Sequence, residues 1–503
     1  MLFRSRPSTA IRTYAFKHAL VRDAAYSSLL EKGQIALHSR IAAVLTKDFP
    51  ETGEAQPELL AYHCQAAGDA ENAVHYLIKA AKLSARRSGF VEAIAQLQGA
   101  LALLDAQPKS RARMRLELRV HVALGGVYAE HRGFSSAACG EAFATALELC
   151  HALGEAPEIF AVLSGVGSFE ITRANFPKCR ALAEECLARA AGQQAKPPFI
   201  MGHLLLGGTL FLTAKFAAAR MHLEEALRLY EEGQPSQRGK QVLYVQDQKS
   251  TGLCYLALTL TTLGDLDSGL RAGESGLDHS RSLGGLHTVN FSLCYLAAVH
   301  HFRGDSREAL RRSTESLELA REQGFATWIG VSQMIRGESL ARNGDVEEGL
   351  KEITAGLNAH REMAAVTYQP FGLSLLAKGL IAAGRLAEAL EAVGEALAIS
   401  EQSGERFYLA ELLRLKGEIL ARKGSPAEAE RWLREAILVS RQQGARLFEL
   451  RSAVGLCGVL DEPRRGKALR EVLEPVYRGF EESGDAPDVH VASALLTAAT
   501  GAD

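Results

Sequence analysis

Glycine returns at a constant interval through the second half of this 503-residue chain. The first set is Gly264, Gly304, Gly344, Gly384 and Gly424, and the residues that follow them are Asp265, Asp305, Asp345, Arg385 and Ser425. A glycine in the left-handed conformation ends a helix, and a following Asp or Ser caps the next one. A second set lies midway between successive members of the first: Gly284, Gly324, Gly404, Gly444 and Gly484, with Ala364 in the remaining place. Each full period of about 40 residues therefore predicts two helices and two turns.

The same register extends into the first half of the chain with small slips. It places further turns at Ser88, Arg132, Ala174 and Ala214. Around all nine turns, Gly, Ala, Ser or Cys occupies the positions seven residues before, five after and twelve after, which makes 27 small residues in 27 places. For the turn at Gly344 they are Gly337, Gly349 and Gly356, and for the turn at Arg132 they are Gly125, Ala137 and Ala144. Antiparallel helices approach to the short end of the usual range of about 8–10 Å only where such side chains meet, so the pattern predicts closely packed hairpins.

Paired helices, a Gly-Asp turn and small residues at the helix crossing resemble the tetratricopeptide repeat, whose unit is about 34 residues long. The present unit is longer, lacks the closing Pro and seldom has Trp or Tyr early in its first helix. It is similar to the repeats in the sensor arms of large bacterial signalling ATPases. The resemblance covers about residues 70 to 483, and it implies an all-α fold: an α-α superhelix of about ten hairpins with a small N-terminal helical remnant.

The repeat register divides the chain into five parts. We expect a remnant with linking helices over 1–66, a first half of the solenoid over 67–231, a loop insertion over 232–242, a second half over 243–484 and a C-terminal cap over 485–503. The insertion is rich in Gly, Gln and Arg and interrupts the register. Beyond Gly444 the motif decays, which is typical of the capping end of a solenoid.

Residues 14 to 63 do not follow the repeat. The run from Tyr14 to Tyr26, with Leu37–Ala42 and Pro57–His63, resembles the end of the winged-helix portion of the signal-transduction ATPases associated with class III adenylate or guanylate cyclases in bacteria. In that family an output domain and an ATP-binding module precede these residues, and a tetratricopeptide-like array follows. The resemblance implies that this chain is the sensor arm, with the missing ATPase or cyclase domains as candidate partners.

A nucleotide site is not predicted within the chain itself. The segment from Gly233 to Lys240 comes nearest to a P-loop, but its spacing is one residue too long. Gln241 also replaces the Ser or Thr that would bind magnesium.

The composition argues against several classes of partner. Lys and Arg number 57 against 59 Asp and Glu, so the net charge of −2 provides no broad field for nucleic acid or anionic lipid. The eight cysteines form no CxxC pair and no zinc-finger spacing, which favours a reducing cytoplasm. The most apolar stretch, Phe199 to Thr213, is too short to span a membrane. We expect a cytoplasmic protein with no direct nucleic-acid partner and no membrane partner.

No residue pattern indicates catalysis, so we assign no catalytic residue, no cofactor and no metal ligand. Adjacent His300 and His301 on one helix face different directions, which disfavours a shared metal. The pairs Cys254 and Cys294, and Cys179 and Cys186, occupy positions typical of packing.

The first helices of tetratricopeptide arrays line a concave groove. The residues expected to point into it are Phe291, His301, Glu338, Arg342, Lys378, Arg414, Glu418 and Arg422. Their mixed charge suits a peptide or protein surface. An aromatic ladder also repeats with the period of the glycines: Trp328, Tyr368, Tyr408 and Phe448. Packing between repeats is the usual role of such a ladder, and the alternative is a stripe of anchors for a partner segment.

These observations predict a non-catalytic scaffold or sensor arm that mediates protein–protein interaction in bacterial signal transduction. The alternative is the sensor domain of a large ATP-dependent transcription activator, in which the superhelix encloses a small molecule such as an oligosaccharide.

Overall fold

The computed structural model describes residues 3–6, 13–16, 18–154, 156–193, 196–233, 246–480 and 486–500. The chain forms two compact units, Met1–Ala123 (unit 1) and Leu124–Asp503 (unit 2). The sequence placed a division at 232–242. Helices α12 (Phe216–Glu231) and α13 (Gln248–Leu263), on either side of that segment, pack against each other within unit 2.

Unit 1 begins with the only strands among the described residues. β1 (Phe3–Arg6) and β2 (Thr13–Phe16) pair antiparallel, with Phe3 opposite Phe16. The sequence had predicted only helices here. The helices that follow are α1 (Ala19–Ser27), α2 (Glu31–Asp48), α3 (Pro50–Ala55), α4 (Pro57–Ala66), α5 (Ala70–Arg86) and α6 (Phe90–Asp105). α5 and α6 form the first hairpin of the repeat.

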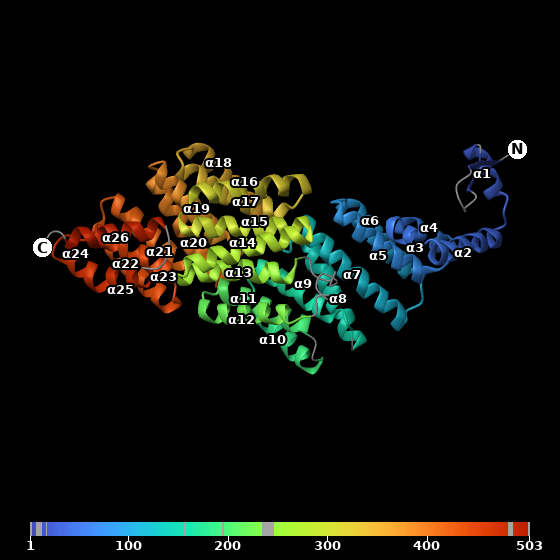
Figure 1. Ribbon diagram of the computed structural model, residues 1–503, viewed down its shortest axis with the longest axis horizontal. Coiled ribbons are helices and arrows are strands. Elements are labelled where there is room, and N and C mark those ends of the chain that lie inside the picture. The colour runs from blue at the N-terminus through green and yellow to red at the C-terminus, as the bar shows by residue number, and fades with distance from the viewer. Residues whose placement is uncertain are drawn as a thin grey trace. The chain divides into compact units, whose positions relative to one another are not determined.

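Unit 2 consists of successive hairpins, in which an odd-numbered first helix precedes an even-numbered second helix (Figure 1). The first helices are α7 (Arg111–Arg132), whose start belongs to unit 1, α9 (Ile159–Thr172), α11 (Lys196–Leu212), α13, α15 (Leu286–Arg303), α17 (Ala326–Arg342), α19 (Gln369–Ala382), α21 (Leu409–Arg422) and α23 (Arg446–Val459). The second helices are α8 (Ala137–Leu153), α10 (Phe176–Gln193), α12, α14 (Leu266–Leu283), α16 (Ser306–Gln323), α18 (Val346–Glu362), α20 (Leu386–Ser403) and α22 (Pro426–Gln443). The C-terminal cap holds α24 (Arg464–Ala468), η2 (Leu469–Leu473), α25 (Glu474–Tyr477), η3 (Arg478–Phe480) and α26 (Pro487–Thr500).

The predicted turns that the structure describes adopt the left-handed conformation, except that the left-handed residue of the turn predicted at Arg132 is the next residue, Gly133. All five glycines of the first set have positive φ, as do the described members of the second set; Gly484 lies outside the described residues. Ala364, which replaces glycine in the second set, also has a positive φ of 54°. Ser88, Ala174 and Ala214 do the same in the earlier hairpins. The geometry of the hairpin therefore requires this conformation even where no glycine is present.

The predicted caps form in part. The Asp265 and Asp305 side chains accept hydrogen bonds from the backbone N–H groups of Ser268 and Glu308. Asp345 and Ser425 begin their helices without a side-chain cap. At these two turns the cap prediction was wrong.

Small residues meet where the two helices of a hairpin cross. A Cβ atom on Gly337 would lie 2.5 Å from the carbonyl oxygen of Gly349. A Cβ atom on Gly417 would lie 3.1 Å from the carbonyl oxygen of Ala429. Because backbone faces backbone at these points, any larger side chain would separate the helices.

One hairpin departs from the predicted register. Ala137 and Ala144 are exposed, and Cys139 and Ala146 occupy the buried crossing instead. The Sγ atom of Cys139 lies 3.5 Å from the carbonyl oxygen of Gly125. The turn between α7 and α8 holds extra residues, and these shift every position on α8 by two.

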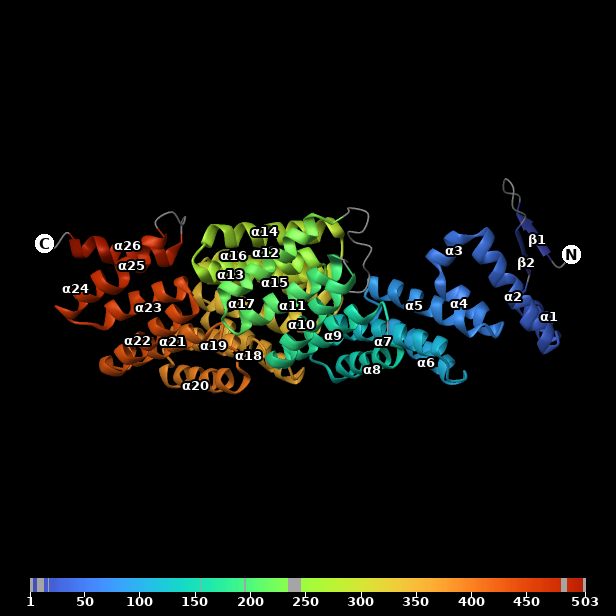
Figure 2. The same cartoon turned by 90° about the horizontal axis from the view of Figure 1, so that it is seen from below.

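Unit 2 winds so tightly that hairpins five apart touch. The carbonyl oxygen of Thr172, at the end of α9, accepts the backbone N–H of Val366 at 2.9 Å. The carbonyl oxygen of Leu212, at the end of α11, accepts the N–H of Arg406 at 2.8 Å. The first helices form a continuous inner row, and Figure 2 shows α11, α13, α15 and α17 between α14 on one side and α20 on the other. One superhelical turn thus takes five hairpins and encloses space inside unit 2.

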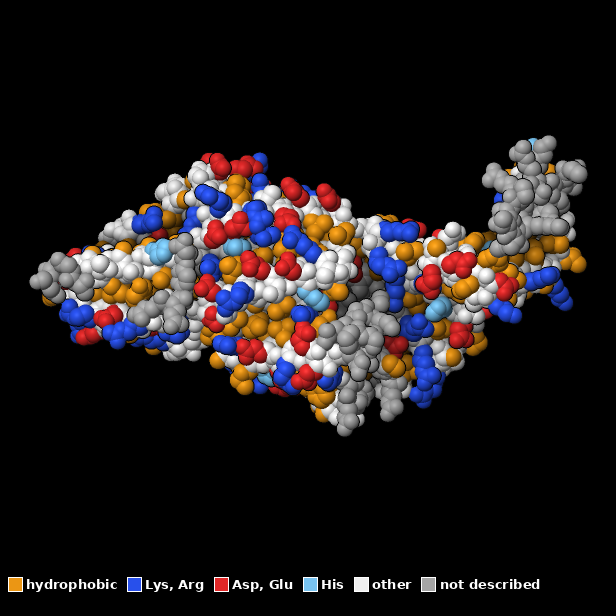
Figure 3. Space-filling model, in the orientation of Figure 1, with side chains coloured by type: hydrophobic (Ala, Val, Ile, Leu, Met, Phe, Trp, Pro, Cys, Tyr) orange, Lys and Arg blue, Asp and Glu red, His pale blue; other side chains and the backbone are white. Residues whose placement is uncertain are grey.

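The surface of unit 2 is mixed in charge. On the face shown in Figure 3, acidic and basic side chains are interspersed over the helices. Among the described residues of both units, no helix combines the length and the apolar character that crossing a bilayer requires.

Candidate functional site

A cleft of about 550 Å³ lies along the inner row of unit 2, between α15 and α26. Seven of the eight predicted groove residues line it: His301, Glu338, Arg342, Lys378, Arg414, Glu418 and Arg422. They meet because α15, α17, α19 and α21 repeat with one period and turn the same face inward. We call this space the charged cleft. The eighth residue, Phe291, is buried and lines a separate cavity.

A chain of three side chains forms one wall of the charged cleft. Lys378 Nζ lies 3.2 Å from His301 Nε2, and His301 Nδ1 lies 3.0 Å from a carboxylate oxygen of Glu338. Since an ammonium group only donates, Nε2 accepts and Nδ1 donates, so the imidazole is neutral. Burial lowers the pKa of His301 to about 4, against the attraction of Glu338. Burial disfavours ionisation of Glu338, but His301, Lys378 and Arg342 outweigh it and hold its pKa at about 2.

A second group of buried charges also lines the charged cleft. Arg414 lies 2.8 Å from the Glu411 carboxylate and 2.9 Å from that of Glu418. Arg451 lies 3.4 Å from Glu411 and 2.8 Å from Asp488. Burial opposes the charge of Glu411, yet Arg414 and Arg451 hold its pKa at about 2. The cleft therefore carries fixed charges of both signs that are largely paired with one another.

Glu411, Arg451 and Asp488 also line the cleft and were not predicted from the sequence. Glu411 and Arg451 stand one repeat period apart, so opposite charges at one repeat position were the available signal. Asp488 lies on α26, beyond the repeat, and no periodic signal points to it.

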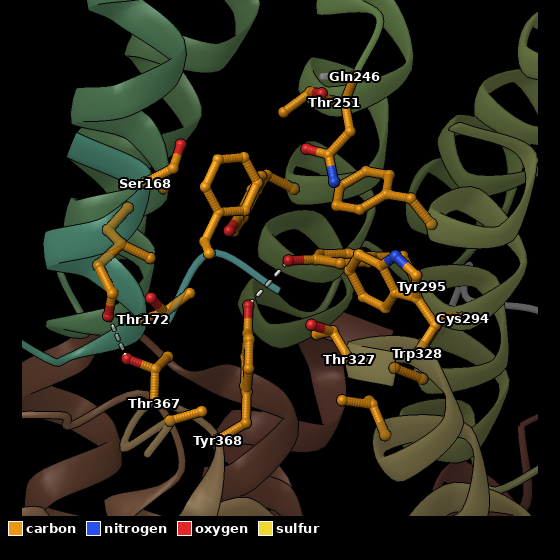
Figure 4. Close-up of a pocket in the computed structure, with 18 of the residues that line it drawn as sticks. Ser168, Thr172, Gln246, Thr251, Cys294, Tyr295, Thr327, Trp328, Thr367 and Tyr368 are labelled. Carbon is orange, nitrogen blue, oxygen red and sulfur yellow. Dashed lines mark hydrogen bonds between the residues drawn. The ribbon is translucent and has the colours of Figure 1, made fainter. Parts of the chain in front are cut away.

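The second cavity, of about 180 Å³, lies inside unit 2 between α7 and the start of α21 (Figure 4). Its aromatic walls are Phe134, Tyr255, Phe291, Tyr295, Phe302, Trp328, Tyr368, Phe371 and Phe407, and we call it the aromatic chamber. The hydroxyl groups of Tyr295 and Tyr368 form a hydrogen bond of 2.8 Å. None of the described residues that line the chamber is Asp, Glu, Lys or Arg.

Tyr368 holds an unusual backbone conformation in the wall of the chamber. Its φ of 72° is left-handed, which side chains of this size rarely adopt. Its backbone N–H donates to the carboxyl group of Glu405 at 3.0 Å. Glu405 is only 2% exposed, and burial raises its pKa to about 8.

The aromatic ladder divides between the aromatic chamber and the core. Trp328 and Tyr368 line the aromatic chamber. Tyr408 is buried, and its hydroxyl lies 3.1 Å from Lys378 Nζ. Phe448 is fully buried and packs edge-on against Tyr408. Packing between repeats therefore accounts for Tyr408 and Phe448, while the other two face an internal cavity.

The residues set aside as structural lie where packing predicts. His300 and His301 diverge, since His300 Nδ1 lies 3.4 Å from Asp305 and His301 contacts Glu338. All eight cysteines are buried as free thiols. Burial raises the pKa of Cys179, Cys254 and Cys294 to about 12, which keeps these thiols protonated.

These stacked hairpins define the protein as a solenoid of the tetratricopeptide-like class. The chain is similar in structure to a Rap protein complexed with competence and sporulation factor, with a TM-score of 0.54 and 12% sequence identity over 74% of this chain and 99% of that chain. A second solved structure, the APC/C hetero-tetramer Cut9-Hcn1, matches at a TM-score of 0.35, with 15% identity and 95% of each chain covered. The first likeness shows the fold.

Sequence comparison adds one relative. The chain is 30% identical over 136 residues to "Uncharacterized protein R02095" of Rhizobium meliloti (strain 1021). This match covers 27% of the present chain and 13% of that protein. No family model matches the chain.

Proposed function

We propose that unit 2 is a non-catalytic scaffold that binds a segment of another polypeptide in the charged cleft. The observation that carries the proposal is the convergence of charged side chains from four successive first helices on one open cleft. In helical solenoids such a concave surface is the usual binding face.

The charge pattern favours a polypeptide over a polyanion. The cleft is lined by five basic residues and four acidic ones, which leaves an excess of one positive charge: Arg342, Lys378, Arg414, Arg422 and Arg451 against Glu338, Glu411, Glu418 and Asp488. A phosphate backbone needs a large excess of positive charge, and an excess of one does not provide it. A peptide with side chains of both signs meets complementary partners.

Two further findings support the binding of a partner in the cleft. The solenoid of similar fold, the Rap protein, is complexed with competence and sporulation factor. Arg342 and Arg422 stand exposed at the rim of the cleft, where charge steers an approaching partner.

A role in bacterial signal transduction is the finer part of the proposal. Its support is the resemblance of Tyr14–Tyr26 to the cyclase-associated ATPases, whose missing domains would then be the cytoplasmic partner. The matched part of the Rhizobium protein is 13% of its length, as expected for an arm of a larger protein. The gene sequence upstream of Met1 tests this point: an in-frame P-loop domain supports it, and its absence there and in neighbouring genes counts against it.

Selection of linear peptides against the purified chain tests the binding proposal. Selected peptides are titrated by fluorescence anisotropy against the wild type, a rim variant (Arg342→Glu with Arg422→Glu) and a control variant (Arg307→Glu with Arg321→Glu). Arg307 and Arg321 are exposed on α16, so the control makes the same change of charge outside the cleft. We expect the rim variant to weaken binding at least tenfold and the control to leave it unchanged. Equal binding by both variants, or no enriched peptide, would refute the proposal.

A further inference from the structure

The aromatic chamber is chemically unlike the charged cleft. Its described walls carry no formal charge, and its ionisable groups stay neutral. Burial raises the pKa of Tyr295 and Tyr368 well above the usual value and lowers that of His287 to about 4. An ion placed there would lose its hydration without gaining a counter-charge. The walls therefore select an uncharged occupant.

The size of the chamber sets the size of that occupant. Protein interiors pack with few voids larger than a water molecule. A chamber of about 180 Å³ is comparable with an engineered apolar cavity of roughly 150 Å³ that stays dry and binds benzene. Wall atoms around an empty space lose dispersion contacts, and a ring-sized molecule restores them.

Polar groups on the wall give the occupant a direction. Figure 4 shows the amide of Gln246 directed into the chamber and the hydroxyls of Tyr295 and Tyr368 joined by their hydrogen bond. The side chains of Gln246 and Ser168 make no hydrogen bond to another described residue. These groups both donate and accept, so they suit a ligand with a carbonyl, amide or hydroxyl group.

The position of Tyr368 shows that the chamber wall is held against local strain. A left-handed backbone at a bulky residue persists only when its surroundings enforce it, and such residues gather at ligand sites. Here the Glu405 carboxyl group holds the Tyr368 N–H from the next hairpin. The hydroxyl of Tyr295 is hydrogen-bonded to the hydroxyl of Tyr368, so both the backbone and the side chain of Tyr368 are held.

We propose that the aromatic chamber is a binding site for a small, uncharged, largely apolar molecule of about one ring that carries an amide, carbonyl or hydroxyl group. Its walls come from hairpins five apart, so a bound molecule also strengthens the contacts of Thr172 with Val366 and of Leu212 with Arg406. The proposal does not depend on peptide binding in the charged cleft. An oligosaccharide is disfavoured, since its many hydroxyls would meet mostly apolar walls.

Tryptophan fluorescence tests the proposal directly. The chain has 2 tryptophans: Trp328 in the chamber, and Trp432 on α22, where it lies beneath Lys416. Trp432→Phe leaves Trp328 as the reporter. The probes are benzamide, which is neutral and polar at one end, its charged near-isostere benzoate, and maltose. We expect benzamide to change the Trp328 emission saturably, with a Kd at least tenfold below that of benzoate and with no effect of maltose. Equal affinity for benzoate, binding of maltose, or no saturable change with benzamide would overturn the proposal.

A filling variant locates the site. Ser168→Met places a flexible side chain in the chamber, and Ser282→Met makes the same change on the exposed face of α14. We expect Ser168→Met to weaken benzamide binding at least tenfold and Ser282→Met to leave it unchanged. Unchanged binding in a folded Ser168→Met variant would place the site elsewhere and defeat the proposal.

Hydrogen exchange of the wild type keeps the test independent of whether the variant folds. Saturating benzamide should slow amide exchange at Val366 and Arg406, whose N–H groups close the superhelical turn. Exchange that is unchanged at both positions would contradict the proposal.

Discussion

Tyr295 and Tyr368 lie 73 residues apart in the chain, yet their hydroxyls meet at 2.8 Å inside unit 2. One belongs to α15 and the other caps the start of α19, two hairpins further on. Their contact exists because the solenoid curves tightly enough for first helices to converge on a common interior. The two cavities of unit 2 follow from the same curvature, and so do several measurable properties.

Replacing Ala364 by glycine should stabilise the protein. A left-handed φ of 54° costs an L-residue roughly 1–2 kcal/mol, and glycine at this position avoids that cost. The greater conformational freedom of glycine in the unfolded chain offsets about 0.5–1 kcal/mol of the gain in stability. We expect Ala364→Gly to raise the free energy of unfolding by about 0.5–1 kcal/mol in urea titrations followed by circular dichroism. Ala383→Gly, at a right-handed residue with φ of −76°, should lower it instead. Stabilisation by both substitutions would show that backbone strain is not the cause.

Adding a side chain where two helices cross should lower the stability of the protein. The Cβ of Gly337→Ala would lie 2.5 Å from the carbonyl oxygen of Gly349 and 2.7 Å from Ile353. We expect a loss of about 3 kcal/mol, at the upper end of typical overpacking. Gly394→Ala is the matched control, because the new Cβ on α20 meets nothing within 4 Å, and it should gain up to about 1 kcal/mol. A Gly337→Ala variant as stable as the wild type would disprove the close crossing.

Glu405 should make the protein less stable in mild alkali. Its pKa rises from 4.5 to about 8 on folding, so the folded state holds a proton that the unfolded state releases. The contribution of Glu405 to the free energy of unfolding is therefore fully present below pH 4.5 and is lost as the pH rises towards 8. Glu405→Gln keeps an acceptor for the Tyr368 N–H and should raise stability at pH 8.5 by at least about 1 kcal/mol, since one pKa unit is worth about 1.4 kcal/mol. Exposed Glu401→Gln should change nothing. An identical pH profile for Glu405→Gln and the wild type would contradict this account.

Two buried histidines should make the protein sensitive to acid. The pKa of His287 and that of His301 fall from 6.5 to about 4 on folding, so only the unfolded state takes up protons in this interval. The contribution of these two histidines to the free energy of unfolding is therefore fully present above pH 6.5 and is lost as the pH falls to 4. His287→Gln should flatten the fall in Tm between pH 6.5 and 4, even though it also loses the hydrogen bond from Trp328. His151→Gln, at an exposed site, should keep the wild-type slope. A slope that is unaltered by His287→Gln would show that its titration does not contribute.

Arg451 should be essential to the charged cleft. Arg451→Met removes a partner of buried Glu411 and the ion pair to Asp488 on α26. Breaking a buried pair by removing one member costs about 3–5 kcal/mol. Arg464→Met is the control, since Arg464 is exposed and its surface pair with Glu430 is worth about 0–1 kcal/mol. Calorimetric unfolding of the two variants measures the difference, and equal losses would indicate that Arg451 is solvated rather than paired.

The sequence by itself determined the repeating hairpin. The left-handed turns, down to Ala364, and the crossing of Gly337 with Gly349 follow from local backbone sterics and from the absence of side chains, and both leave a periodic record. The convergence of Lys378, Arg414 and Glu418 on one cleft was predictable for the same reason, because helices of one period repeat the same face.

Only the tertiary structure decided what the interior holds. The shift of the helix crossing on α8 to Cys139 depends on the length of a single turn. A register that is common to all the repeats does not reveal such a local difference. The meeting of Leu212 with Arg406 and the pairing of Arg451 with Asp488 depend on the pitch of the superhelix. That pitch is the sum of small angles at many helix contacts, and no single residue pattern records it. The aromatic chamber exists only because those angles close one turn in five hairpins.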